Sequence, residues 1–302
     1  MANYLKYSDI PVFGNFSQEN TSPLNAVATH MFATSDASLN LDANVSPIRY
    51  LGGKKATMPA SGPLEGKFSF TFYPMIESSN ANEKLNIQKI NQLKFFDLTG
   101  DFAFGHSIYM SNFLLKRTYL QSYSIKINPY QPISVSANMI SYDVTNIEYT
   151  SLTGQSFVPS ITKDSTKPNY EALHGLTASL SPNIKYNLPE SKTSIEVNVD
   201  CQRTPVYTIG SRLPDKVVLT SVERTVTVQG ENIGQIMSIT GSEASDLNLF
   251  LLPLSQIGIT PNATTAKNFL SFNINGTVVS QQLSISQNSM LNGRVIIKEI
   301  VF

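Results

Sequence analysis

Alternation of apolar and polar residues with a period of two is the main pattern along this chain. In Lys67-Phe68-Ser69-Phe70-Thr71-Phe72, three phenylalanines fall on one face of an extended backbone and the polar residues fall on the other. Such alternation predicts a β-strand with one face on a core and the other on water or a partner. We expect strands at 67–72, 102–108, 119–127, 133–139, 171–180, 194–201, 217–222, 225–228, 235–240, 269–274, 279–286 and 294–302.

Helical periodicity is scarce. The best helical segment is 80–95, in which Leu85, Ile90 and Leu93 form a narrow apolar stripe. A second short helix is expected near 262–269. The pattern therefore predicts a mainly β protein, built from antiparallel sheet with one or two short helices.

The two halves of the chain repeat each other. Pro47-Ile48-Arg49-Tyr50-Leu51-Gly52 matches Pro205-Val206-Tyr207-Thr208-Ile209-Gly210 at an offset of 158 residues. Because a slip of one residue would reverse every face of a strand, agreement of phase on both sides of this turn favours tandem duplication over chance. The flanking pairs at this offset are Leu39/Val197, Leu41/Val199, Ala43/Cys201, Glu65/Glu223, Phe68/Val226 and Phe70/Val228. Near the end of each half the alignment moves to an offset of 160, with the pairs Tyr123/Leu283, Ile125/Ile285, Val135/Val295 and Ala137/Ile297.

The repeat and the local composition predict the domain organisation. A chain of 302 residues is long enough for one large domain or two ordinary ones. Residues 1–24 carry two prolines and no sustained period, so we expect an N-terminal arm. Residues 152–170 are rich in Ser, Thr, Pro and Lys and are expected to be a linker. The β domains are then predicted at 25–151 and 171–302.

Charge is balanced and sparse. The chain has 22 Lys and Arg against 22 Asp and Glu, and charged residues make up only 15%. The surface is instead expected to be rich in hydroxyls and amides, since the chain holds 36 Ser, 24 Thr and 26 Asn. This balance disfavours sequence-independent binding to nucleic acid, which needs an excess of cationic side chains. A net charge of zero also gives little repulsion between copies, which suits a subunit that associates.

One cysteine excludes an intrachain disulfide framework and any cysteine-rich zinc site. Cys201 continues the inward series of Ile195, Val197 and Val199, so we expect a small core residue. No stretch approaches the roughly 20 apolar residues of a membrane helix. The first ten residues lack an apolar signal-peptide run, so synthesis in the cytoplasm is expected.

The search for catalytic chemistry finds almost nothing. His30, His106 and His174 are far apart and share no metal-ligand spacing. The one local carboxylate–imidazole cluster is Asp97 and Asp101 with His106 behind them, and a turn before a strand explains it better. We therefore expect no catalytic residue, no metal ligand and no cofactor. An enzyme would need a constellation that only folding assembles, for example Asp101 and His106 with a distant partner.

Each half contains an alternating strand, a Pro-x-x-x-(Leu/Ile)-Gly turn, a loop and another long strand. A late strand pair follows in the first half, at 119–125 and 133–142. This arrangement resembles the tail-tube protein family of long-tailed bacteriophages, including the related tube-fold domains of baseplate hubs. The resemblance covers about residues 25–150 and 171–302. This chain departs from the family by duplication, since an ordinary tube subunit has one such domain.

The resemblance implies two tandem antiparallel β-barrel or sandwich domains, each with a short flanking helix. It also implies assembly, because tube subunits join their sheets edge to edge in sixfold rings. A two-domain chain would then close a pseudo-sixfold ring as a homotrimer and stack into a tube in the virion tail. The implied partners are further copies, other tail proteins (sheath, tape measure, baseplate or terminator) and DNA that passes without sequence-specific binding; no membrane is implied.

Two loops, 49–66 and 207–217, are expected to contact the next ring, followed by the arm. The residues expected at these contacts are Gly52, Lys54, Lys55, Gly210, Arg212 and Asp215. Ordinary solvent-exposed hairpins would look the same in sequence. Two other functions stay open, a hub or adaptor ring with the same fold and a carbohydrate-binding β-sandwich adhesin. The absence of Trp counts against the adhesin.

Overall fold

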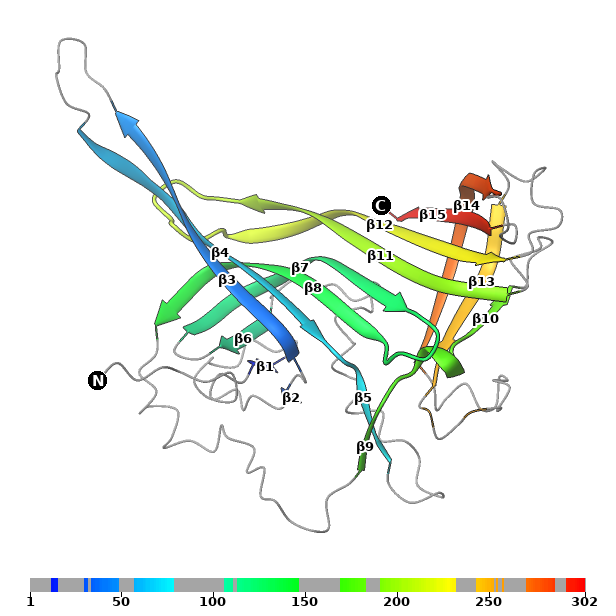
Figure 1. Ribbon diagram of the computed structural model, residues 1–302. Coiled ribbons are helices and arrows are strands. Elements are labelled where there is room, and N and C mark those ends of the chain that lie inside the picture. Colours follow the sequence, from blue (N-terminus) through cyan, green and yellow to red (C-terminus); the bar gives the residue numbers. More distant parts are fainter. Residues whose placement is uncertain are drawn as a thin grey trace.

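The computed structural model describes residues 12–15, 30–31, 34–48, 57–78, 106–110, 113–146, 169–182, 191–231, 243–252, 254, 257, 270–285 and 292–301. These residues fold almost entirely as antiparallel β-sheet, and their only helix is the single 3-10 turn η3, Gly175–Thr177. The expectation of a mainly β protein is confirmed (Figure 1). The helices expected at 80–95 and 262–269 and the strand at 235–240 lie outside the described residues.

Long strands make up most of the structure. In the first half they are β3 (Thr34–Ile48), β4 (Thr57–Phe72), β7 (Phe113–Ile127) and β8 (Ser134–Asn146). In the second half they are β11 (Ser191–Val206), β12 (Lys216–Glu231), β14 (Leu270–Ser284) and β15 (Asn292–Val301). The shorter strands are β1 (Val12–Asn15), β2 (His30–Met31), β5 (Met75–Ser78), β6 (His106–Met110), β9 (Asn169–Ala172), β10 (Ser179–Pro182) and β13 (Glu243–Leu251).

Several predicted strands are longer or shorter than their alternation suggested. The strands expected at 217–222 and 225–228 are one strand, β12, and those expected at 269–274 and 279–286 are one strand, β14. The strand expected at 171–180 is wrong as a single element, because η3 interrupts it. The His174 side chain caps this turn, accepting a hydrogen bond at Nδ1 from the Leu176 N–H at 3.1 Å.

Part of the predicted contact loop at 49–66 is strand instead. β4 begins at Thr57, so 57–66 continues the hairpin with β3. Gly62 and Pro63 fall in the predicted loop, but the register skips from Ala43↔Leu64 to Val45↔Ser61 and leaves both residues in an irregularity of the ladder. A bulge of this kind accommodates a proline without ending the strand pair.

The two halves have the same strand order. The pairing runs β1-β6-β7-β8-β4-β3 in the first half and β10-β13-β14-β15-β12-β11 in the second. Register repeats as well, since Leu39↔Phe68 in the first hairpin corresponds to Val197↔Val226 in the second at the predicted offset of 158. This agreement is what tandem duplication would produce. The boundaries of arm, linker and domains stay predictions; within the predicted arm, Val12–Asn15 form β1.

The offset of 160 predicted near the end of each half is wrong. Ala137 pairs with Phe70, and Val295 pairs with Val228. Since Phe70 and Val228 are 158 apart, Ala137 corresponds to Val295 and not to Ile297. Alternation fixes which face a residue occupies but not its position along the strand, so an alignment displaced by two residues keeps every face correct.

One hydrophobic core is shared by both halves. Phe68, Phe70 and Phe72 lie along its β4 side, each at most 2% exposed, with neighbouring ring centroids 5.2 and 5.5 Å apart. From the second half, Val226 and Val228 of β12 are fully buried in the same cluster. The inward positions of the alternating strands therefore form the core, as the pattern predicted.

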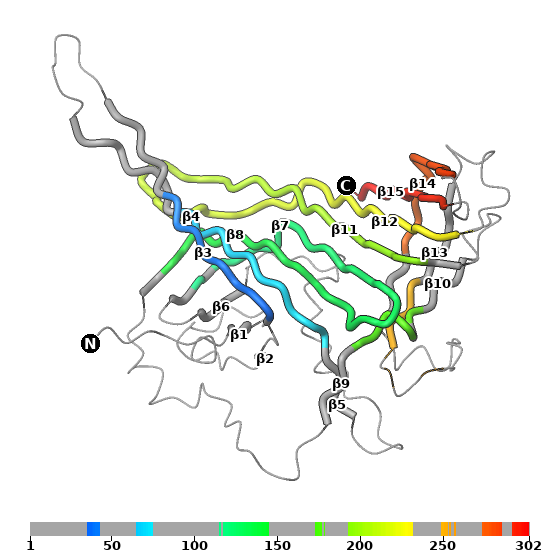
Figure 2. The backbone as a smooth tube through the Cα atoms, viewed as in Figure 1, coloured from blue at the N-terminus to red at the C-terminus, as the bar shows by residue number. Residues whose placement is uncertain are grey.

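The halves are joined by direct pairing of β7 with β11. The ladder runs from Ser122↔Asp200 to Ile127↔Ile195. It creates a central antiparallel sheet in the order β3-β4-β8-β7-β11-β12-β15-β14, with β3 and β14 at opposite ends. Figure 1 and Figure 2 show the β11–β12 hairpin extending from the second half over the first, toward the long β3–β4 hairpin.

Replacing Phe70 by alanine should lower the free energy of unfolding by about 3–5 kcal/mol, because the stacked ring would leave a cavity in the shared core. Urea denaturation followed by circular dichroism measures the change. Lys67→Ala is the control on the same strand; it removes only an exposed ion pair and should cost at most about 1 kcal/mol. Equal effects of the two substitutions would contradict the assigned core.

Candidate functional site

Among the residues that the structure describes, no group of three or more His, Cys, Asp or Glu is placed to hold a metal ion. In the same residues, no helix is long and apolar enough to cross a membrane. Cys201 is 5% exposed in the core, and burial raises the pKa of its thiol to about 11. Its prediction as a core residue is confirmed. Asp97 and Asp101 lie outside the described residues.

The turn between β11 and β12 is a compact exposed loop. Gly210 has a φ of +89°, a conformation that side chains other than glycine rarely adopt. The Ser211 N–H donates to the Thr208 carbonyl at 3.1 Å, and the Asp215 N–H donates to the Val206 carbonyl at 2.8 Å. Both bonds join backbone groups within the loop and hold its turn.

Three predicted contact residues, Gly210, Arg212 and Asp215, are exposed in this loop. Ile209 lies beside them and is fully exposed, which sequence reasoning did not single out. Ile209 occupies the (Leu/Ile) position of the Pro-x-x-x-(Leu/Ile)-Gly turn, so the motif could have marked it as an apolar residue in an exposed turn. Gly52, Lys54 and Lys55, the predicted contacts of the first half, lie outside the described residues.

Two arginines fasten the β11–β12 hairpin to the first half. Arg203 Nε donates to the Leu120 carbonyl at 2.9 Å, and its guanidinium lies 5.5 Å from the centroid of the Tyr119 ring. Arg117 Nη1 donates to the Pro214 carbonyl at 3.0 Å. The sequence analysis did not identify either arginine as a contact residue. The sequence feature that could have pointed to them is a positively charged side chain within a strand otherwise rich in hydroxyl groups.

A small apolar cluster lies under the same hairpin. Tyr119, Ile140 and Tyr142 of β7 and β8 pack with Val217 of β12. The Tyr119 and Tyr142 ring centroids are 6.1 Å apart, in a tilted arrangement. Burial raises the pKa of the Tyr142 phenol to about 12, so this phenol stays uncharged over the whole neutral range. The hairpin is therefore held by apolar burial as well as by the arginines.

The β7–β11 junction has one apolar and one polar face. Ile125 and Ile127 of β7 lie opposite Val197 and Ile195 of β11, and all four side chains are at most 5% exposed. On the other face Lys126 lies opposite Glu196, an arrangement of opposite charges that stabilises a cross-strand pair. The junction is thus a complete strand interface inside one chain.

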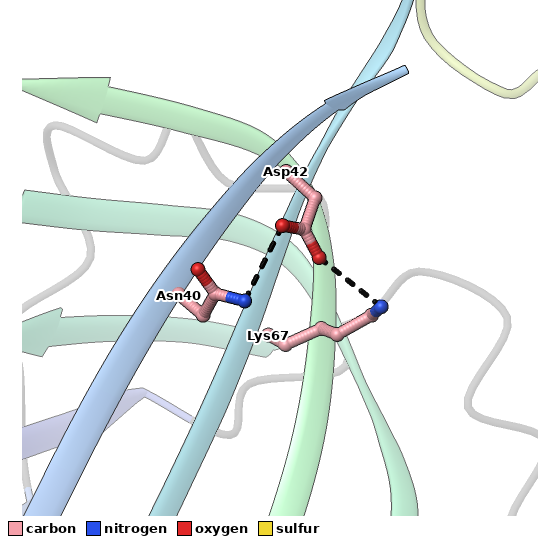
Figure 3. A network of polar contacts seen from close by, with 3 residues as sticks. All are labelled: Asn40, Asp42 and Lys67. Carbon is pink, nitrogen blue, oxygen red and sulfur yellow. Dashed lines mark hydrogen bonds and ion pairs between the residues drawn. The ribbon is translucent and has the colours of Figure 1, made fainter.

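β3 lies at an open end of the central sheet. In the described part of the chain it pairs with β4 alone. On its polar face Asp42 accepts hydrogen bonds from Lys67 Nζ at 3.2 Å and Asn40 Nδ2 at 3.3 Å (Figure 3). The carboxylate is therefore partly neutralised, and β3 carries no lysine from 34 to 48 to oppose pairing with another strand.

Comparison with known proteins adds no identity. No protein-family model matches the chain, and no curated protein sequence matches it. Function is therefore argued from the sheet, its open edges and the exposed hairpin loop.

Replacing Arg203 by methionine should lower the free energy of unfolding by about 2 kcal/mol, because the Leu120 carbonyl loses a charged donor and Tyr119 loses its cation. Arg212→Met is the matched control in the exposed loop and should change stability by less than about 0.5 kcal/mol. Urea denaturation of both variants measures the difference. A neutral Arg203→Met variant would show that apolar packing alone holds the hairpin.

Alkaline pH should destabilise the protein partly through Tyr142. In the unfolded chain a tyrosine loses its proton near its ordinary pKa of 10.0, whereas native Tyr142 keeps it to about 12. The unfolded state therefore binds fewer protons in this window, and the free energy of unfolding falls as pH rises from 10 toward 12. Tyr142→Phe should make that fall shallower in denaturation measured across this range. An unchanged slope in Tyr142→Phe would contradict the burial of this phenol.

Proposed function

We propose that this chain is a non-enzymatic structural subunit of a bacteriophage tail tube. The observation that carries the proposal is the repeated sheet: both halves have one strand order and one register, and β7 joins β11 edge to edge. In a ring built by joining sheets, each unit must present one edge that fits the next unit. This chain contains two such units already joined.

The proposal assigns a tube domain to each half, at 25–151 and 171–302. Each is an antiparallel barrel or sandwich with a short flanking helix, and three chains close a pseudo-sixfold ring. Rings stack into a channel in the virion tail, in contact with other tail proteins. A closed sheet also removes the open edges that would otherwise drive aggregation.

Charge supports a channel that DNA crosses without being held. The chain is neutral overall, with 22 basic and 22 acidic residues. Tight, sequence-independent binding to DNA requires clustered Lys and Arg that displace counterions from the phosphates. Hydroxyl and amide groups dominate the polar positions instead, for example Ser122 and Ser124 on β7 and Asn198 on β11. Such a surface offers phosphate few strong contacts.

The β11–β12 loop supports stacking of one ring on the next. It is rigidly bonded, stands out from the sheet and presents Ile209 fully exposed beside Arg212 and Asp215. An exposed isoleucine flanked by charges of both signs is the arrangement expected of a contact between neutral surfaces.

Negative-stain microscopy of the purified protein should show rings and hollow tubes, because both the sheet edges and the hairpin loops are available for contact. Single rings that never stack would favour a hub or adaptor ring instead. Monomers that persist at high concentration would contradict the proposal.

The variant Ile209→Asp should form rings that stack poorly, because a carboxylate replaces the apolar contact between rings. Microscopy would show the ratio of rings to tubes, and circular dichroism would show an unchanged fold. Tyr130→Asp is the control, since it also adds a carboxylate to an exposed turn but lies outside the predicted contact loop. Normal tubes from Ile209→Asp would remove this loop from the stacking contact.

A further inference from the structure

Among the described residues, the β7–β11 junction has a counterpart in which no strand is paired. At the offset of 158, residues 122–127 of β7 correspond to residues 280–285, which are the end of β14 and Ile285 directly after it. Residues 195–200 of β11 correspond to residues 37–42 of β3. A register shift at the same place supports this equivalence, between Leu120 and Ser122 in β7 and between Val278 and Ser280 in β14. The chain therefore holds both halves of a second junction, one on β3 and one on β14.

The edge of β14 is open where the edge of β7 is filled. β13 pairs with β14 only up to Thr277, and β15 covers the other side. The effect on burial is large. Ile127, beside β11, is 3% exposed, whereas its counterpart Ile285 is 79% exposed. A neighbouring strand buries the first side chain, and in the described residues no strand pairs beside the second.

Side-chain exposure differs in the same way between β11 and its counterpart β3. Val199 of β11 lies opposite Tyr123 of β7 and is 1% exposed. Its counterpart on β3 is Leu41, which is 41% exposed. Both residues have the same position in their own hairpin, because Leu41 pairs with Gly66 and Val199 pairs with Arg224 at the same offset. The missing neighbour thus accounts for the difference in exposure.

Side-chain exposure on β15 differs in the same way from side-chain exposure on β8. Tyr142 of β8 is 4% exposed because the β11–β12 hairpin covers it. Its counterpart at the same offset is Ile300 of β15, which is 48% exposed, next to Val301 at 44%. In the first half a hairpin of the following unit covers this face. In the second half, no hairpin among the described residues covers the corresponding face.

We propose that a second copy of this chain supplies the missing unit, pairing its β3 with β14 in the register of β7 and β11. The pairs are Ala37↔Ile285, Leu39↔Leu283 and Leu41↔Gln281, and the β3–β4 hairpin of that copy covers Ile300 and Val301. The proposal deepens the proposed function by naming the contact between subunits, but it requires only self-association. It joins different edges of the two copies, so the contact is head-to-tail, the type of contact from which rings are built when the rotation between copies closes.

A second copy fits these edges better than another protein does. The two open edges lie at opposite ends of the central sheet, as Figure 1 and Figure 2 show, so one chain cannot join them to each other as a single strand pair. Each residue pair of the proposed ladder corresponds to a residue pair of the β7–β11 ladder inside the chain. In the paired segment only Asp42 is charged, it already contacts Lys67, and its partner Ser280 is neutral.

Engineered cysteines test the register directly. In Ala37→Cys with Ile285→Cys, the new thiols of neighbouring copies lie opposite each other, so mild oxidation should give reducible multimers on a denaturing gel. Leu41→Cys with Ile285→Cys is the control; it moves one thiol four residues along β3, about 13 Å away and beyond disulfide reach. Equal yields of multimer from the two pairs, or no multimer from the first, would overturn the proposed register.

Charge at the edges tests the contact without a cross-link. Leu41→Lys with Ile285→Lys places an ammonium on each edge, at side chains outside the core, and should leave a folded monomer by circular dichroism and analytical ultracentrifugation. Ile257→Lys is the control at another exposed apolar residue and should leave assembly intact. Assembly of the double lysine variant at wild-type concentrations would overturn the proposal.

The outcomes separate this inference from the proposed function. Tubes in the microscope without the Ala37–Ile285 cross-link would keep the tube subunit and overturn the β3–β14 contact. Cross-linked closed rings that never stack would support the contact and contradict a tube. Dimers linked through two copies of Ile285→Cys alone would show pairing of like edges and would also overturn the head-to-tail contact.

Discussion

The pairing of β7 with β11 is the interaction on which the rest of the structure depends. It places two repeats of one topology in a single sheet, so the apolar faces of both halves meet in one core. It also brings the β11–β12 hairpin over the first half, where Arg203 donates to the Leu120 carbonyl and Arg117 donates to the Pro214 carbonyl. Beside this ladder Ile127 is 3% exposed, whereas its counterpart Ile285 is 79% exposed.

Alternation predicted most of the strands because a half-buried sheet requires it. The phenylalanines of β4 and the valines of β11 are buried as their phase indicated. A period-two pattern is unchanged by a shift of two residues. The sequence alignment of the two halves was therefore two residues out of register near their ends. Nor could the pattern show how far the first hairpin extends, because a bulge in the ladder accommodates Gly62 and Pro63 within the loop predicted at 49–66.

The candidate contact surface could be predicted from the sequence only in part, for a different reason. A loop is marked locally by glycine and proline, so the turn around Gly210 could be found from sequence. The contacts of Arg203 with Leu120 and Tyr119 join residues more than 80 positions apart, and no local pattern encodes them. The open edges of β3 and β14 are visible only by comparing two structural counterparts, one with a neighbour and one without.

In the proposed ring, joining two units in one chain lowers the entropy lost on assembly. When two units share a chain, every second junction forms during folding, at the high effective concentration that a covalent connection provides. Only the proposed β3–β14 junctions would then depend on encounters between copies. The apolar residues exposed near those edges include Leu41 of β3, Ile285 directly after β14, and Ile300 and Val301 of β15, and the proposed contact would bury them. A neutral surface with few lysines at the edges then lets copies approach without charge repulsion, which is the condition that head-to-tail pairing needs.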